Sequence, residues 1–121
     1  MGLEFSHTDA YFSFRTFHMF RQRIARMAGI NLDEMEGYSD PGKPWSDVDD
    51  PLVPLLHRSD CDGEISPADC ERLAPRHLQL LDAWQESDGD ALYAYAQLNG
   101  RKLVRGMENC IAMDHSLQFY G

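Results

Sequence analysis

The stretch DPLVPLLHRSDCDGEISPAD, residues 50 to 69, decides the fold. Asp50 is a typical helix N-cap residue, and Pro51 follows it at the first helical position, where no backbone N–H is needed. Ser66 and Pro67 repeat this arrangement. The stretch therefore predicts two capped helices joined by a tight turn that is rich in aspartate.

The turn resembles the middle of an EF-hand calcium-binding loop. In that motif oxygen ligands alternate along the loop, a glycine at position six allows a sharp bend, and an acid at position twelve closes the site. Gly63 takes position six here. The candidate metal ligands are then the acids at positions three, five and twelve, which are Asp60, Asp62 and Asp69. The resemblance implies a helix-loop-helix unit with calcium as its ion.

The loop departs from the motif at position one, which is Arg58 instead of an aspartate. An arginine removes one oxygen ligand and brings a permanent cation close to the ion's place. Position twelve is also an aspartate, shorter than the usual glutamate. We therefore expect a metal-free loop without a cofactor, in which the guanidinium pairs with the aspartates. Calcium binding through residues 58 to 69 is the alternative.

Two other chemistries use residues of the same region. His57, Cys61, Cys70 and His77 offer four nitrogen and sulfur ligands for zinc, but their spacings of 4, 9 and 7 match no common zinc finger. Cys61 could act as a nucleophile, yet the adjacent aspartates would raise the pKa of its thiol. The chain also lacks the common phosphate-binding and hydrolase motifs. We expect a protein that is not an enzyme.

Charge is distributed unevenly along the chain. The 11 basic and 20 acidic residues give a net charge of −9, which disfavours nucleic acid as a partner. Residues 1 to 30 carry a net +2, whereas residues 31 to 71 carry a net −10. The basic N-terminal helix could dock on the acidic middle of the same chain. Alternatively, the acidic middle binds a basic or polar protein partner, or imitates nucleic acid.

The acidic segment GYSDPGKPWSDVDD, residues 37 to 50, has the composition of a loop. Tryptophan and charged residues in a loop are common interface components, so Trp45, Asp47 and Asp49 are the candidate interaction residues. Trp45 could instead anchor the loop to the hydrophobic core. The leading functional hypothesis is a small acidic, non-catalytic interaction or regulatory module.

Hydrophobic periodicity completes the fold prediction. Residues 1–121 are expected to form a single α-dominated domain, because this length supports one core. The class predicted is mainly α, with four or five helices, a central EF-hand-like helix-loop-helix and short strands at the termini. The predicted helices cover about 15–28, 51–58, 67–85 and 90–113. Pro75 is expected to kink or divide the third of these.

The sequence also bears on location. It contains no apolar run of about 18 residues, as a membrane span requires, and no signal peptide is visible at its start. Three cysteines cannot all pair within one chain, which fits a reducing compartment. We therefore expect a cytoplasmic protein with no membrane partner.

Three segments resemble those of a small, single-domain bacterial family of actinomycete type. They are FRQRIARMAGI (residues 20–30), DDPLVPLL (residues 49–56) and SDCDGEISPADC (residues 59–70). The resemblance implies a bacterial cytoplasmic protein, and it supplies no catalytic residues.

Overall fold

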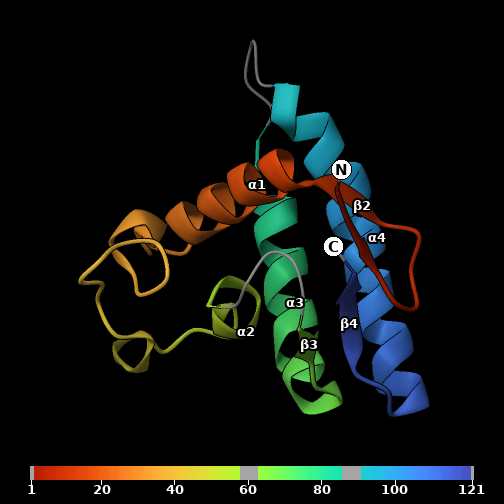
Figure 1. The fold of residues 1–121 in the computed structure, drawn as a ribbon. Helices are drawn as coiled ribbons and strands as arrows, with labels where there is room; N and C mark the ends of the chain where they lie inside the picture. The colour runs from red at the N-terminus through yellow and green to blue at the C-terminus, as the bar shows by residue number, and fades with distance from the viewer. Residues whose placement is uncertain (1, 58–62, 86–90, 121) are drawn as a thin grey trace.

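The computed structural model describes residues 2–57, 63–85 and 91–120. Figure 1 shows α3 and α4 side by side, with α1 lying across them and strands β1, β2 and β4 next to α4. The elements are β1 (Gly2–Phe5), β2 (Tyr11–Ser13), α1 (Phe14–Met27), the 3-10 helices η1 (Leu32–Glu34) and η2 (Trp45–Asp47), α2 (Val53–Leu56), β3 (Glu64–Ile65), α3 (Pro67–Ala83), α4 (Ala91–Met113) and β4 (Leu117–Tyr120).

The expectation of a mainly α, α-dominated fold is wrong. In the described parts of the chain, four antiparallel strands form one sheet in the order β2-β1-β4-β3, so the class is mixed α and β. The short terminal strands were predicted, but their association was not. β1 lies between β2 and β4 and thereby joins the two ends of the chain in one sheet.

The sheet was missed because its last strand lies in the segment interpreted as a calcium loop. Ile65 of β3 pairs with Leu117 of β4, and both side chains are fully buried. The backbone N–H of Phe119 also donates to the carbonyl oxygen of Gly63 at 3.0 Å. A hydrophobic residue at this place in an EF-hand pairs with a neighbouring loop. Here the partner is the C-terminal strand of the sheet.

Helix α1 confirms the prediction for residues 15–28. Its N-cap is Ser13, whose side-chain oxygen accepts a hydrogen bond from the backbone N–H of Thr16 at 3.1 Å. Phe17, Phe20 and Ile24 lie on one face of the helix and are fully buried.

Two predictions about the helices are corrected here, namely the length of α2 and the division of α3 at Pro75. The helix expected over 51–58 is a single turn, Val53–Leu56, in a segment where Pro51 and Pro54 lack a backbone donor. In α3 the Ser66 cap is confirmed, because its hydroxyl accepts from Asp69 N–H at 3.1 Å. Pro75 does not divide α3, which continues to Ala83. Pro75 lies on the exposed side, where water can bind the carbonyl that it leaves free.

A glycine allows α3 and α4 to approach closely, as its position in a predicted helix suggested. A Cβ atom on Gly100 would lie 3.0 Å from Leu81 Cδ2 and 3.4 Å from Phe20 Cζ. Beside this contact, the side-chain amide of Gln97 donates to the carbonyl oxygen of Leu81 at 2.7 Å. Packing and hydrogen bonding therefore hold the two helices together.

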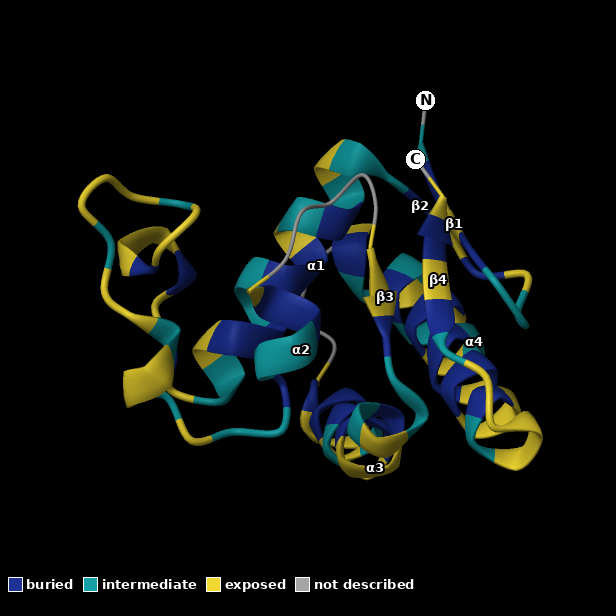
Figure 2. Cartoon of the chain, turned by 60° about the horizontal axis from the view of Figure 1, so that its bottom comes forward, coloured by how far each residue is buried: buried dark blue, intermediate teal, exposed yellow. Residues whose placement is uncertain are grey.

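Aromatic side chains fill the space between the sheet and α1. Phe5 of β1 contacts Phe17 of α1 and Phe119 of β4, with ring centroids 5.8 and 5.0 Å apart. Phe12 of β2 stacks on Phe20 at 5.0 Å. Figure 2 shows the buried residues gathered where the helices and the sheet face one another. The core thus ties both ends of the chain to the first helix.

Candidate interaction surface

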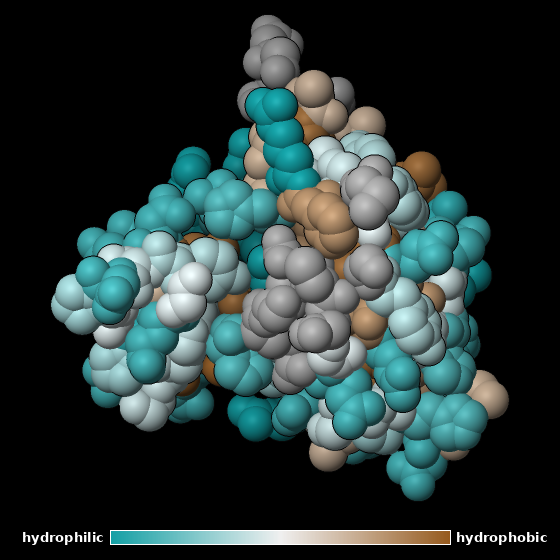
Figure 3. Space-filling model, viewed as in Figure 1, coloured by the Kyte–Doolittle hydropathy of each residue, from teal (hydrophilic) through white to brown (hydrophobic). Residues whose placement is uncertain are grey.

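Residues 31–50, which we call the acidic lobe, connect α1 to α2 and project to one side of the molecule (Figure 1). The lobe carries seven carboxylates and a single lysine. In Figure 3 the left part of the molecule shows mainly teal and white atoms, which mark hydrophilic to neutral residues, with a few brown ones. It contains the predicted interaction residues Trp45, Asp47 and Asp49.

The acidic lobe is attached to the helices by a small apolar base. Leu32 and Met35 are only 2% and 4% exposed. The Tyr38 hydroxyl donates to the carbonyl oxygen of Leu56 in α2 at 2.8 Å, and its ring stacks on His18 of α1 with centroids 6.0 Å apart. These contacts give the lobe a defined position, although it contains little regular structure.

Trp45 is half-buried and connects the two arms of the acidic lobe. Its indole N–H donates to the carbonyl oxygen of Glu36 at 2.9 Å. The same arms are joined by backbone hydrogen bonds from Glu36 N–H to the Lys43 carbonyl oxygen at 3.0 Å, and from Lys43 N–H to the Glu34 carbonyl oxygen at 2.8 Å. Trp45 therefore combines a scaffold role with partial exposure, so the interaction reading and the anchor reading both fit it.

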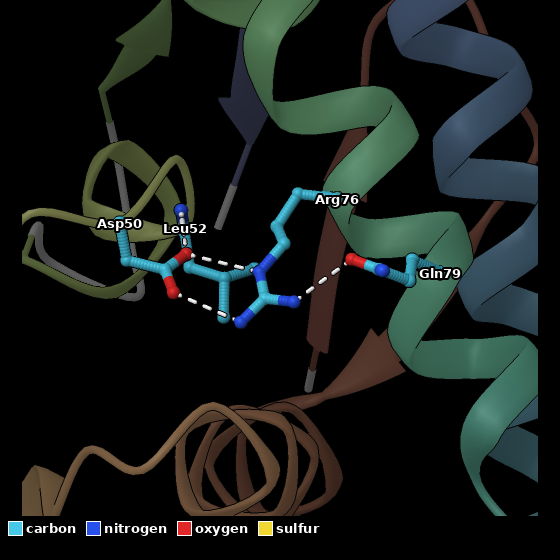
Figure 4. A network of polar contacts seen from close by, with 4 residues as sticks. All are labelled: Asp50, Leu52, Arg76 and Gln79. Atoms are coloured by element: carbon cyan, nitrogen blue, oxygen red, sulfur yellow. Dashed lines mark hydrogen bonds and ion pairs between the residues drawn. The ribbon is translucent and has the colours of Figure 1, made fainter.

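At the C-terminal end of the acidic lobe, Asp50 is neutralised by Arg76 of α3 (Figure 4). Arg76 Nε and Nη2 donate to the two carboxylate oxygens at 3.3 and 3.0 Å, a bidentate arrangement. The Asp50 side chain is 13% exposed, and its Oδ1 also accepts from Leu52 N–H at 2.9 Å. The prediction of Asp50 as the helix N-cap is wrong, because α2 begins later, with Leu52 as its N-cap and without a side-chain cap. The ion pair joins the segment before α2 to α3.

The other six carboxylates of the lobe have different surroundings. Glu34 pairs with Lys43 at 2.7 Å, on the surface, and Asp33 accepts from the side-chain amide of Gln22 at 3.0 Å. Over the residues that the structure describes, no hydrogen bond or ion pair reaches four exposed side chains, which are Glu36, Asp40, Asp47 and Asp49. Since no cation of the described residues neutralises them, they present a negative field to solvent.

Of the three predicted metal ligands, the structure describes only Asp69. Asp60 and Asp62, together with Arg58, lie outside the described residues. Asp69 stands in the first turn of α3, where a carboxylate interacts favourably with the helix dipole. Within the described ranges no three His, Cys, Asp or Glu side chains converge on a common point. The calcium alternative remains a prediction.

The zinc and nucleophile alternatives involve residues of the core. Cys70 and His77 are fully buried on the inner face of α3, and Cys61 is outside the described part of the chain. Burial, with smaller contributions from Cys110 and Asp69, raises the pKa of the Cys70 thiol to about 11. Burial also lowers the pKa of His77 to about 4. Both groups are therefore neutral at pH 7, as expected of core residues.

Two residues of this surface were missed in the sequence, namely Tyr38 and Arg76. Tyr38 follows Gly37 in a segment that was interpreted as a loop. Its hydrogen-bond partner Leu56 lies 18 residues further along the chain, so the sequence around Tyr38 does not reveal that it anchors the lobe. Arg76 lies 26 residues from Asp50. The available signal was that Arg76 falls at a partly buried position of a predicted helix.

Comparisons of the chain with family models, curated proteins and solved structures found no match. In the part of the chain described here, no helix is both long enough and apolar enough to cross a bilayer.

Proposed function

We propose that this chain is a non-catalytic interaction module whose acidic lobe binds a basic protein partner. The observation that carries the proposal is the set of four exposed carboxylates that have neither a hydrogen bond nor an ion pair among the described residues. Trp45 belongs to the same lobe, and its partial exposure offers apolar contact in addition to the charge. Complementary charge of this kind accelerates association and selects partners.

The attachment of the lobe supports a binding role over a purely solvating one. Tyr38 and Trp45 hold the backbone in place, so the carboxylates are presented in a defined arrangement before a partner arrives. Preorganisation lowers the entropy cost of binding. We place the protein in the cytoplasm, because Cys70 and Cys110 are free thiols and reducing compartments preserve these.

The test compares two quadruple variants with equal changes in charge. The lobe variant is Glu36→Gln, Asp40→Asn, Asp47→Asn and Asp49→Asn. The control variant neutralises four exposed acids elsewhere, through Glu4→Gln, Glu71→Gln, Glu108→Gln and Asp114→Asn. Each is used as bait against a bacterial lysate, and bound proteins are quantified by mass spectrometry. A protein held by the wild type and by the control, but not by the lobe variant, is then purified.

Isothermal titration of that purified protein gives the decisive number. We expect its affinity for the wild-type chain to fall as salt is raised, because exposed charges are screened beyond about 8–10 Å at 0.1–0.15 M salt. Equal affinities for the wild type and the lobe variant would reject the acidic lobe as the binding surface. A partner lost from both quadruple variants would indicate a response to net charge alone.

A further inference from the structure

Two histidines from opposite ends of the chain meet at the surface. His7 lies in the turn between β1 and β2, and His115 lies in the turn between α4 and β4. Nε2 of His7 is 3.0 Å from Nδ1 of His115, and the ring centroids are 5.1 Å apart. His115 is exposed and His7 is half-buried, so both rings are accessible to ions. This histidine pair is not part of the binding surface proposed for the acidic lobe.

The backbone on each side of the pair is held in an uncommon conformation. His7 has φ of 65° and Asp114, next to His115, has φ of 56°, both in the left-handed region. Among non-glycine residues, His and Asp adopt this region more readily than most, typically in turns and at helix ends. Asn109 Nδ2 donates to the His7 carbonyl oxygen at 3.0 Å, and His115 N–H donates to the Cys110 carbonyl oxygen at 2.9 Å. These contacts hold the backbone that carries the two rings.

Ser6 and His7 share a hydrogen bond. Ser6 Oγ accepts from Gln118 N–H at 2.9 Å, lies 2.9 Å from His7 Nδ1, and is 3.5 Å from the Ser116 carbonyl oxygen. Metal binding requires the tautomer in which His7 Nδ1–H donates to Ser6 Oγ, because this leaves the lone pair of Nε2 free on the side of His115. A metal-bound histidine commonly shows the same arrangement, with its other nitrogen donating to an oxygen.

From this geometry we propose that His7 Nε2 and His115 Nδ1 bind a divalent transition-metal ion, with copper(II) preferred. Without metal, His115 Nδ1–H donates to His7 Nε2. When the ion binds, this proton moves through solvent to His115 Nε2, which has no partner in the described chain, so no net proton is released. No third protein ligand converges there in the described residues, and water completes the coordination shell.

The spacing of the two nitrogens, which is a hydrogen-bond distance, is also compatible with neighbouring ligands of one class of ion. With metal–nitrogen bonds of about 2.0–2.1 Å, nitrogens 3.0 Å apart subtend an angle of about 90–97° at the ion. Square-planar and tetragonal ions such as Cu²⁺ and Ni²⁺ prefer this angle between neighbouring ligands. Tetrahedral zinc requires the nitrogens about 3.3–3.4 Å apart. Affinity for nitrogen ligands also peaks at copper in the divalent series.

The charges around the pair permit a cation. Asp9 neutralises Lys102 at 3.3 Å, and Asp82 pairs with Arg101 at 2.7 Å. Arg105, which lines the same surface hollow of about 520 Å³ as His7, is the nearby cation that no acid in the described residues neutralises. The net charge of −9 for the whole chain offsets this local charge. The hollow leaves room beside His7 for water ligands.

The test is a titration of the full chain with CuCl₂, NiCl₂ and ZnCl₂, followed by calorimetry. We expect one equivalent of Cu²⁺ to bind, more tightly than Ni²⁺ and Zn²⁺, and a rise in melting temperature on binding. His7→Asn and His115→Asn each lose this one-to-one binding, and Asn tolerates the left-handed conformation at position 7. His57→Asn removes an exposed histidine elsewhere and should bind Cu²⁺ as the wild type does.

Pulsed EPR of the copper-loaded wild type tests the site independently of whether the variants fold. Modulation from the remote nitrogens of two imidazoles is expected, and each single variant that retains metal should show at most one. Wild-type Cu²⁺ affinity in both His7→Asn and His115→Asn would overturn the proposal. A wild-type spectrum without two imidazoles, or tightest binding of Zn²⁺, would do so as well.

Discussion

The α3–α4 hairpin and the acidic lobe use charged residues in opposite ways. On the hairpin, Arg76 and Arg101 each pair with an aspartate, and Gln97 donates to a backbone carbonyl of the facing helix. In the lobe, Asp47 and Asp49 are exposed without a partner in the described chain. Charge in the hairpin therefore contributes to the fold, whereas these lobe charges are available to another molecule.

The boundary between the two uses of charge runs through neighbouring residues. Asp49 is exposed, while Asp50 is bound by Arg76 and by a backbone N–H. Sequence position therefore does not distinguish a structural carboxylate from a binding one. Replacing residues on each side of this boundary, and in the core behind it, shows whether the distinction holds.

The largest effect is expected in the core of the hairpin. Leu103 of α4 is fully buried, and Leu103→Ala should lower the free energy of unfolding by about 2–5 kcal/mol through lost burial and a cavity. Val48→Ala, at a half-buried position of the lobe, should cost below about 1 kcal/mol, because less apolar surface is lost. Urea unfolding followed by circular dichroism measures both. Equal losses would mean that lobe and hairpin share one core.

The next effect depends on pH and originates in the same core. His77 has a folded pKa of about 4 against an ordinary 6.5, because burial disfavours its charged form. The unfolded chain therefore takes up a proton first as the pH falls. Stability from this group is complete above pH 6.5 and declines between pH 6.5 and 4, by about 3 kcal/mol in all.

His77→Leu removes this titration and keeps an apolar side chain beside Phe20, whose ring centroid is 5.3 Å from that of His77. Between pH 7 and 4.5 the variant should lose less stability than the wild type, as urea midpoints at several pH values will show. Carboxylate titrations affect both proteins alike. Parallel pH profiles would contradict burial as the cause.

Breaking the ion pair at the boundary should have an intermediate effect. Arg76→Gln or Asp50→Asn should each cost about 1.5 kcal/mol, since the pair is bidentate and mostly shielded from water. A double-mutant cycle measured by urea unfolding should give a coupling energy of about 1 kcal/mol. A coupling near zero would place Asp50 with the exposed lobe carboxylates.

Loosening the lobe should have a small, local effect. Tyr38→Phe removes the hydroxyl that donates to Leu56, which is worth about 1 kcal/mol. Hydrogen exchange at Glu36 and Lys43, whose amides bond within the lobe, should accelerate about fivefold while α3 and α4 are unchanged. Tyr120→Phe is the control, as its hydroxyl is exposed. Faster exchange throughout α4 would contradict a local attachment.

Local signals in the sequence predicted α1, α3, α4 and the terminal strands, whereas α2 is shorter than expected. The Ser66 cap, the stripe of Phe17, Phe20 and Ile24, and the close approach at Gly100 each depend on residues within one element. The sheet could not be predicted, because β3 joins β4 across more than fifty residues of chain. The same holds for the sites: the acids of the lobe were evident, but the meeting of His7 with His115 spans 108 residues.

The smallest effect on stability is expected at Asp47 and Asp49. Asp47→Asn with Asp49→Asn should change the free energy of unfolding by less than about 0.5 kcal/mol, as usual for exposed charges without a partner. Any change should be stabilising, since repulsion within the lobe is relieved, and should disappear in 1 M salt, where the screening length falls to about 3 Å. Urea unfolding at two salt concentrations measures it. A loss above about 1 kcal/mol would show that these carboxylates support the fold. Unchanged stability allows any loss of partner binding to be assigned to the charges themselves.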